Sequence, residues 1–284
     1  MTHSELDLSS LRYDLHTHST ASDGTLSPEQ LVARACEKGV EVLALTDHDT
    51  VRGIRSLLAR DIQGIRLIGG TELTCLWGKR VVHIVGLNVD TESQELHQYL
   101  SEIDQLRVQR AQQIAQRLVK KGLPDLLPAA KDKADEGVIG RPHFAAAMVA
   151  EGIVRTEQQA FSQYLGTGKV GDVKMAWPTM EQAIEVIRQA GGIAVLAHPT
   201  KYRFTFTKIR ELLTDFKAQG GGALEVSYIG ISPSHQQELI KLALKHDLLI
   251  SAGSDFHSPG QHWTEVGRFT PIKQSAPHIL EYIL

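Results

Sequence analysis

His16 and His18 stand one residue apart at the end of an apolar stretch, and Asp23 follows them closely. In a β-strand, residues i and i+2 point to the same side, so both imidazoles would face one point in space. Asp255 and His257 repeat this spacing near the other end of the chain. Imidazole and carboxylate groups that converge in this way are common ligands of divalent transition metals. The spacing therefore predicts metal chemistry.

Other metal-capable residues end further apolar runs of the sequence. The full set of expected metal ligands is His16, His18, Asp23, His48, Glu72, His83, His198, Asp255 and His257. One ion takes roughly four to six ligands, so this set implies two or three ions. A lone histidine in an apolar strand, such as His83, is more often a core residue with a hydrogen-bond partner. Clustering at so many strand ends nevertheless favours a metal site.

The acidic neighbours of His48 are expected to play a different part. Asp47 and Asp49 should alternate to the other side of the strand, where they would support a ligand or a turn. The remaining histidines fall in termini, loops or polar helix faces, and we expect them to be solvated: His3, His97, His235, His246, His262 and His278. We find no glycine-rich phosphate loop and no serine-histidine-aspartate arrangement that would offer a rival catalytic site.

Seven short apolar runs are expected to be the strands that position these residues. They are LRYDLHTH (11–18), VEVLALTDHD (40–49), IRLIGGTEL (65–73), RVVHIVGL (80–87), GIAVLAHP (192–199), GGALEVSY (221–228) and DLLISAGSDFH (247–257). Helical patterns alternate with most of them, and two begin with capping signals, at Ser27 and at Thr179. This alternation predicts a parallel barrel or a related α/β arrangement, in which the strand ends would meet at one face.

A helical segment interrupts the alternation. A long polar helix is expected from about 93 to 121, followed by two short helices that each end at a glycine. No strand is expected between about 93 and 170. We therefore divide the chain into a first barrel part (1–95), a small helical insert (96–170) and a second barrel part (171–284).

Composition limits the possible function classes. The chain has 284 residues, and its 30 basic and 33 acidic residues give a formal charge of -3, so any phosphate binding must be local. The two cysteines, Cys36 and Cys75, are too few for a disulfide framework and are expected to be buried packing residues in a reducing compartment. We see no signal peptide and no apolar run of about 18 residues, which predicts a cytoplasmic protein.

Several motifs, in order along nearly the whole chain, resemble the polymerase and histidinol phosphatase family, the PHP domain. They are DLHTHS with SDG, TDHDT, GTEL, HIVG, AHP and GSDFH. The segments GRPHFA and YLGTGKVG resemble the branch of this family that contains 3′,5′-nucleotide bisphosphate phosphatases and 5′-3′ exoribonucleases of the RNase AM type.

The resemblance implies an α/β fold, a distorted seven-stranded (βα)7 TIM-like barrel with a small helical insert. It also implies a trinuclear metal centre with three ions per chain, usually Mn2+, with Zn2+ or Fe2+ as other candidates. Carried onto this chain, the three ions would be held by His16, His18, Glu72 and Asp255, by Asp23, His48 and His257, and by Glu72, His83 and His198.

These metals predict phosphate-ester hydrolysis. Divalent ions beside only three carboxylates leave a positive pocket that suits a phosphoryl group. The expected nucleophile is a metal-bridging hydroxide held by Glu72, His16 and His198. In the resembling branch, the enzyme releases the 3′-phosphate of a 3′,5′-bisphosphonucleotide, and the exoribonuclease breaks the equivalent P–O3′ bond at a 5′-phosphorylated RNA end. One geometry would serve both reactions.

The expected partner is a nucleotide or short single-stranded RNA substrate, with no membrane and no obligate protein partner. Candidate substrate-binding residues are Arg141, His143, Lys169 and Lys201 for the 5′-phosphate, and Tyr202 or Trp77 for stacking on a base. The basic residues of the long helix could guide RNA, but we interpret them as a solvated face: Arg107, Arg110, Arg117, Lys120 and Lys121.

Two other functions remain open at this point. A histidinol-phosphate phosphatase, or another small phosphomonoester phosphatase on the same barrel, would ignore RNA. A non-catalytic metal-binding PHP module would retain metal without turnover. The intact ligand set argues against the second alternative.

Overall fold

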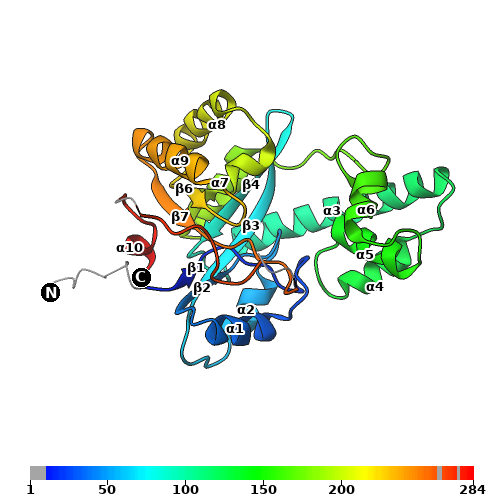
Figure 1. Ribbon diagram of the computed structural model, residues 1–284, viewed down its shortest axis with the longest axis horizontal. Coiled ribbons are helices and arrows are strands. Elements are labelled where there is room, and N and C mark those ends of the chain that lie inside the picture. Colours follow the sequence, from blue (N-terminus) through cyan, green and yellow to red (C-terminus); the bar gives the residue numbers. More distant parts are fainter. Residues whose placement is uncertain (1–10, 261–263, 274–275) are drawn as a thin grey trace.

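The computed structural model describes residues 11–260, 264–273 and 276–284, and its centre is one sheet that curls into a nearly closed barrel (Figure 1). The strands follow each other in sequence order around the barrel. They are β1 (Tyr13–Asp14), β2 (Val42–Leu45), β3 (Arg66–Trp77), β4 (Arg80–Leu87), β5 (Ile193–Leu196), β6 (Ala223–Ser227) and β7 (Leu249–Ala252). Each falls in a run expected to be a strand, so the prediction of seven strands is confirmed.

Helices cover the outside of the barrel and build a separate lobe (Figure 1). Those beside the barrel are α1 (Pro28–Glu37), α2 (Arg52–Leu58), α7 (Met180–Gln189), η2 (Pro199–Tyr202), α8 (Phe206–Ala218), α9 (Pro233–Lys245) and α10 (Leu280–Ile283). Those of the lobe are α3 (Gln94–Lys120), α4 (Leu127–Ala134), α5 (Arg141–Ala150), α6 (Glu157–Ala160) and η1 (Phe161–Leu165). The Ser27 and Thr179 side chains form the expected capping boxes of α1 and α7.

One strand departs from a purely parallel barrel. β4 is antiparallel to both of its neighbours, β3 and β5. Trp77 pairs with Arg80, so only Gly78 and Lys79 connect β3 to β4. A parallel connection needs a dozen or more residues, so a two-residue turn imposes an antiparallel hairpin. The ligand candidate His83 therefore lies near the start of its strand, at the barrel end where the other strands finish.

The two edges of the sheet meet through the residues that follow β1 and β7. Thr17 bridges Phe256, and the Asp255 amide donates to the carbonyl of His16 over 2.8 Å. A Cβ atom on Gly253 would lie 2.5 Å from the His16 amide nitrogen, so only glycine permits this close approach. The closure brings the first and last candidate ligands of the sequence side by side.

The barrel interior is apolar below the candidate ligands. Inward side chains of the strands join the C-terminal residues around α10 in one buried cluster, which contains Leu15, Val42, Ala44, Ile68, Val85, Leu87, Val195, Ala197, Ala223, Ile279, Leu280 and Ile283. Val85 and Leu87 point inward, and the two-residue period of a strand then directs His83 inward as well. α10 fills the end of the barrel where the parallel strands begin, beside Arg66.

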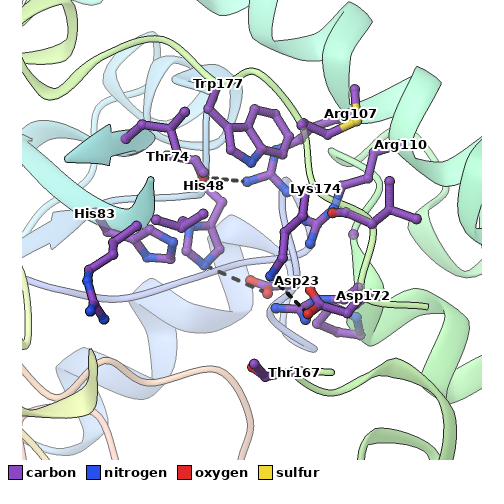
Figure 2. Close-up of a pocket in the computed structure, with 18 of the residues that line it drawn as sticks. Asp23, His48, Thr74, His83, Arg107, Arg110, Thr167, Asp172, Lys174 and Trp177 are labelled. Atoms are coloured by element: carbon purple, nitrogen blue, oxygen red, sulfur yellow. Dashed lines mark hydrogen bonds and ion pairs between the residues drawn. The ribbon is translucent and has the colours of Figure 1, made fainter. Parts of the chain in front are cut away.

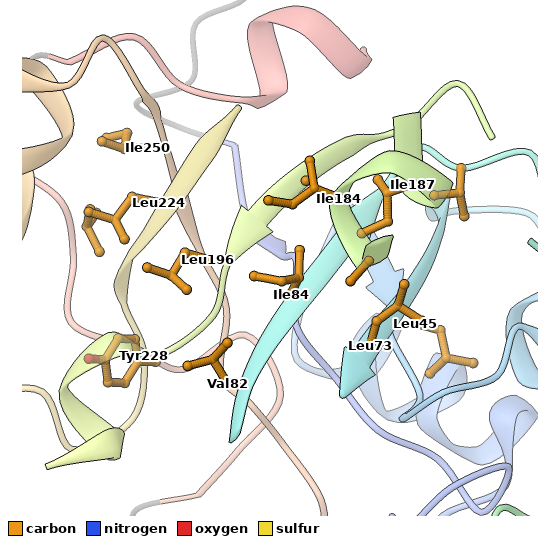
Figure 3. Close-up of a cluster of buried hydrophobic side chains, with 14 of the residues drawn as sticks. Leu45, Leu73, Val82, Ile84, Ile184, Ile187, Leu196, Leu224, Tyr228 and Ile250 are labelled. Carbon is orange, nitrogen blue, oxygen red and sulfur yellow. The ribbon is translucent and has the colours of Figure 1, made fainter. Parts of the chain in front are cut away.

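The outer faces of the strands pack against the helices. Figure 3 shows Ile184 and Ile187 of α7 beside Ile84 and Leu73 of the sheet, and all four belong to the largest buried cluster. Cys75 is also buried here, as expected. Cys36 is exposed on α1, so the prediction that both cysteines are packing residues is wrong for Cys36.

α3 links the barrel to the lobe. Leu96 and Leu100 in its first turns join the barrel cluster, whereas Ile114 and Leu118 near its end join a second buried cluster with α4, α5 and η1. The helix has 27 residues and is therefore about 40 Å long. The domain boundaries at 95 and 170 stay a prediction. No helix in the described ranges is long and apolar enough to cross a membrane.

Candidate active site

The structure brings all the expected metal ligands together at one end of the barrel. Three overlapping groups have potential ligand atoms within 4.8 Å of one another: His18, Asp23, His48 and His257; His16, His18 and Glu72; and His48, Glu72 and His83. The remaining two candidates touch these groups. Asp255 Oδ1 lies 3.2 Å from His18 Nε2, and His198 Nε2 lies 2.8 Å from Glu72 Oε1.

Glu72 is the centre of this arrangement. Its side chain is completely buried on β3, and its two oxygens face five imidazoles at distances of 2.8 to 3.3 Å: His16, His18, His48, His83 and His198. The parallel bridge between His48 and Glu72 aligns the end of β2 with the middle of β3. A carboxylate in this position can serve more than one ion.

Several polar atoms in this buried cluster have no hydrogen-bond partner within the described residues. They are His16 Nε2, His18 Nδ1 and Nε2, His48 Nδ1, Glu72 Oε2 and His198 Nδ1. A buried polar atom without a partner costs about 1–3 kcal/mol, so a cluster of them is unfavourable unless something else binds them. Convergent imidazole and carboxylate groups are suitable ligands for divalent transition metals, and the residues therefore fit metal binding.

Two of the candidate ligands hold a strained backbone. His198 has φ of 27° and Asp255 has φ of 54°, in the left-handed region that non-glycine residues rarely occupy. Hydrogen bonds hold both in place, because the His198 amide donates to Glu225 Oε2 over 2.6 Å and the Asp255 amide donates to His16. Strain of this kind persists only where the surrounding structure enforces it, as at functional sites.

Glu225 is a residue that the sequence interpretation missed. It lies on β6, the only strand to which no chemical role was given, and its side chain is buried. Its Oε1 lies 3.0 Å from His16 Nδ1, so it orients the ring whose Nε2 faces Glu72. Carboxylates behind a ligand histidine fix its tautomer and raise its basicity. A lone glutamate in the apolar run ALEVS was the available signal.

Asp47 and Asp49 take the supporting roles expected of them. Asp47 accepts hydrogen bonds of 2.7 Å from the Ser19 amide, the Ser19 hydroxyl and the Ser22 hydroxyl, and so holds the loop that carries Asp23. Asp49 accepts a hydrogen bond of 2.6 Å from the amide of Thr74, two residues after Glu72. Each aspartate thus fixes the backbone beside a candidate ligand.

Opposite charges keep the carboxylates of the cluster ionised in spite of their burial. Burial alone would raise the pKa of Asp23, but His257 and His48 hold that pKa well below its ordinary value. Burial would lower the pKa of His257, but Asp23 and Asp255 raise it to about 10. Burial also opposes ionisation of Asp255, but the charges of Lys201, His16 and His257 together outweigh it, so the pKa of Asp255 is lowered. Ionised carboxylates are the form that binds metal.

A cavity of about 840 Å³ leads from this cluster toward the lobe (Figure 2). Side-chain exposure rises from 0% at Glu72 to 25% at His83, which marks where the cluster opens. Asp23, His48 and His83 line the cavity on the barrel side, and Arg107, Arg110 and Arg141 line it on the lobe side. A phosphorylated substrate would therefore meet candidate metal ligands and guanidinium groups in one space.

Arg141 is the expected phosphate anchor that lies in the cavity wall. Its Nη1 donates to the Leu165 carbonyl over 3.1 Å, which leaves other guanidinium donors for a ligand. His143 Nδ1 accepts a hydrogen bond of 2.9 Å from the Gly140 amide, and the His143 ring lies beside the backbone of Ser22. It joins α5 to the loop that carries Asp23.

The other expected substrate-binding residues lie outside the cavity wall. Lys169 is exposed, and Lys201 forms an ion pair with Asp255. The Tyr202 hydroxyl accepts from the His83 amide and donates to the Ala197 carbonyl, so it joins two strands beside candidate ligands. Trp77 donates through Nε1 to Asp215 over 2.7 Å. Substrate contact by these four residues stays a prediction.

Two residues of the long helix contradict the interpretation that its basic residues form a solvated face. Arg107 is buried, and Arg110 is largely buried, because both point from α3 into the cavity and stack near Trp177. Burial, together with the charges of Arg141 and Arg107, lowers the pKa of Arg110 to about 10. The helical period places these two on the face of α3 that meets the site, whereas Lys120 and Lys121 are exposed as expected.

The prediction of solvated histidines is wrong for His278. Its side chain is buried beside Tyr13, and its Nε2 lies 3.0 Å from the Tyr13 hydroxyl. It pairs with Ile250 of β7 and directly precedes Ile279 and Leu280, which are buried in the barrel cluster. His3 and His262 lie outside the described residues.

The nearly closed sheet and its buried cluster of imidazoles and carboxylates define a metal-binding α/β barrel. A model of the PHP domain matches residues 14–121. A 5′-3′ exoribonuclease of Haemophilus influenzae is 45% identical over 95% of this chain and 98% of its own length. A 3′,5′-nucleoside bisphosphate phosphatase of Chromobacterium violaceum is 39% identical over 89% of this chain and 90% of its own length. The chain belongs to the PHP domain family.

Solved structures agree with this assignment. One is a protein of Chromobacterium violaceum described as an amidohydrolase, with bound sulfate and no metal. It is 36% identical, the match covers 96% of this chain and 95% of that protein, and the TM-score is 0.89. A protein of Bifidobacterium adolescentis described as a metal-dependent phosphoesterase is 29% identical, with 91% of each chain covered and a TM-score of 0.82. The barrel prediction is thereby confirmed.

Proposed function

We propose that this protein is a metal-dependent phosphoesterase that removes the 3′-phosphate of 3′,5′-bisphosphonucleotides and degrades short 5′-phosphorylated RNA from its 5′ end. The single observation that carries this proposal is the shared cavity, in which candidate metal ligands face the guanidinium groups of Arg110 and Arg141. The names of the similar proteins from Haemophilus influenzae and Chromobacterium violaceum support both activities.

One bond cleavage explains both activities. Water adds to the phosphorus, the P–O3′ bond breaks, and the electron pair leaves with O3′, which takes up a proton. A bisphosphonucleotide then yields a nucleoside 5′-phosphate and inorganic phosphate. An RNA chain yields the same nucleoside 5′-phosphate and a shorter RNA that again begins with a 5′-phosphate.

The proposed metal centre has three ions, with manganese as the expected metal. The first would be held by His16, His18, Glu72 and Asp255, the second by Asp23, His48 and His257, and the third by Glu72, His83 and His198. Bound there, divalent ions would neutralise phosphate oxygens and lower the pKa of water. Glu225 fixes the orientation of His16 through the 3.0 Å contact to Nδ1.

The lobe would select the substrate. Arg110 and Arg141 bind the 5′-phosphate, because guanidinium groups donate paired hydrogen bonds to phosphate oxygens and these two are half-buried in the cavity wall. Arg110 has only one hydrogen bond to a described residue, at 3.3 Å to the Val173 carbonyl, so most of its donors are available. Anchoring at this end leaves the next phosphorus of the substrate near Asp23 and His48.

The test is to incubate the metal-loaded protein with adenosine 3′,5′-bisphosphate and to identify the products. We expect AMP and inorganic phosphate. Adenosine 3′-phosphate would show that the substrate binds in the opposite direction. A parallel assay with histidinol phosphate separates the rival phosphatase, which would turn over that ester faster than the bisphosphonucleotide. Retained metal without turnover of any phosphoester would indicate a non-catalytic module.

A further inference from the structure

The cavity has a second basic end that the proposed function does not use. The β3–β4 hairpin forms this wall with Lys79, Arg80 and Val81, and Phe204 from the loop after η2 lies beside it. We call these four residues the hairpin platform. The Arg80 guanidinium carbon lies 5.0 Å from the centre of the Phe204 ring, so a cation and an aromatic face stand together.

The platform carries charge that the described residues do not neutralise. Lys79 and Arg80 are exposed, and neither forms an ion pair with any residue in the described ranges. The side chain of Val81 is 42% exposed although it is apolar. Unpaired cations next to an exposed apolar side chain and a half-buried aromatic ring are features that bind single-stranded nucleic acid, because phosphates contact the cations and bases cover the apolar faces.

The platform and the lobe arginines lie at opposite ends of the cavity. Figure 2 shows His83 on one side, Arg107 and Arg110 on the other, and Asp23 and His48 between them. The platform begins on the strand of His83, with Val81 on the same face two residues before it. Consider an RNA molecule whose 5′-phosphate is held by the lobe and whose first internal phosphorus faces Asp23. The rest of this RNA must continue past His83.

We propose that the hairpin platform binds the nucleotides downstream of the cleaved bond, so that a single RNA strand crosses the cavity from the lobe to the β3–β4 hairpin. This inference rests on the proposed function, since it assumes that the lobe holds the 5′-phosphate. The platform offers two cations and apolar side chains, and it has no side-chain amides that could hydrogen-bond the edges of particular bases. Binding therefore tolerates any sequence.

The test compares two substrates that differ only in downstream length. One is adenosine 3′,5′-bisphosphate, which ends at the cleaved phosphate, and the other is a 5′-phosphorylated tetranucleotide. The variant K79Q/R80Q removes two cations from the platform. The matched control K120Q/K121Q removes two cations from the exposed end of α3, away from the cavity. Thermal melting checks that all proteins are folded.

We expect K79Q/R80Q to lower the ratio of kcat/KM for the tetranucleotide to kcat/KM for the bisphosphonucleotide about tenfold at low salt, which corresponds to about 1.4 kcal/mol. The slope of log kcat/KM against log salt concentration for the tetranucleotide should fall by about 0.7 for each phosphate that the platform no longer neutralises. K120Q/K121Q should keep the wild-type ratio and slope.

Each other outcome has a defined meaning. An unchanged ratio in K79Q/R80Q, or an equal decrease in K120Q/K121Q, would overturn the inference, because the platform would then add nothing beyond overall charge. Failure of the wild-type protein to hydrolyse either substrate would instead contradict the proposed function. The two failures are distinguished by the wild-type assay alone.

Discussion

Arg107, near the middle of α3, forms an ion pair with the fully buried carboxylate of Asp49, the residue directly after His48. Arg107 Nε donates to Asp49 Oδ2 over 2.6 Å, and its Nη2 donates to Thr74 Oγ1 over 3.0 Å. Asp49 also accepts from the Thr74 amide, two residues after Glu72. One guanidinium group therefore joins the lobe helix to the two strands that carry His48 and Glu72.

Replacing Arg107 should destabilise the protein because it leaves a buried carboxylate without its partner. We expect Arg107→Met to lower the free energy of unfolding by about 3–5 kcal/mol, as measured by urea denaturation. The double variant Arg107→Met with Asp49→Asn should recover part of this stability, since the unpaired charge is then absent. A double variant as unstable as the sum of the two single variants would show that the pair is not coupled.

Glu225→Gln should weaken metal binding, because glutamine keeps the shape of the side chain but loses the charge that orients His16. We expect the apparent metal affinity to be roughly 10- to 100-fold lower, which is the usual effect of removing the hydrogen-bond partner of a ligand histidine. Titration calorimetry with Mn2+ and the metal content after dialysis measure it without an activity assay. Glu181→Gln, which removes an exposed carboxylate from α7, is the control. Equal affinity in the two variants would contradict the role of Glu225.

Arg110→Gln should raise the KM for substrates with a 5′-phosphate. We expect about a tenfold increase for adenosine 3′,5′-bisphosphate, or about 1.4 kcal/mol, and a much smaller change for adenosine 3′-phosphate, which lacks the group to be anchored. Arg117→Gln on the exposed side of α3 is the matched control. If Arg110→Gln raises the KM for both substrates by the same factor, Arg110 does not bind the 5′-phosphate.

His278 should make the fold less stable in mild acid. Burial lowers its pKa to about 4, and its Nδ1 accepts a hydrogen bond from the Leu280 amide, which requires the neutral ring. Between pH 6.5 and about 4 the unfolded chain binds a proton that the folded chain does not, so stability decreases as the pH falls through this range. The expected contribution is about 3 kcal/mol.

The measurement is chemical denaturation of wild-type protein and His278→Gln at several pH values between 4 and 7. The variant should have the smaller pH dependence, because it lacks the group that titrates on unfolding. His235→Gln, on the exposed face of α9, should retain the wild-type dependence. A variant curve parallel to that of the wild type would contradict the assignment to His278.

The strands and the candidate ligands were predictable because both depend on local patterns. Short apolar runs gave the strands, and the i, i+2 spacing of His16 and His18 and of Asp255 and His257 gave the convergence. The direction of β4 was also within reach, because only six residues (74–79) separate the runs 65–73 and 80–87, too few for a parallel crossover. That signal was overlooked because the alternation of strands and helices elsewhere favoured a parallel order.

The cavity wall was not predictable in the same way. Whether Arg107 and Arg110 face solvent or substrate depends on how α3 packs against the barrel, which a helix sequence rich in charged and amide residues does not specify. The burial of His278 and the contact of Glu225 with His16 depend likewise on closure of the sheet. These contacts join segments hundreds of residues apart, and no local pattern encodes them.

α3 sets the distance between the barrel side and the lobe side of the site. It starts at the barrel end opposite the candidate ligands, reaches their level at Arg107 after about 20 Å, and extends about as far again into the lobe. Each residue inserted after Arg107 would rotate the lobe by about 100° and shift it by about 1.5 Å. Under the proposed function, the length of α3 sets the distance between the residues that hold the 5′-phosphate and the candidate metal ligands. An insertion in α3 would keep the two groups facing each other only if it added complete helical turns.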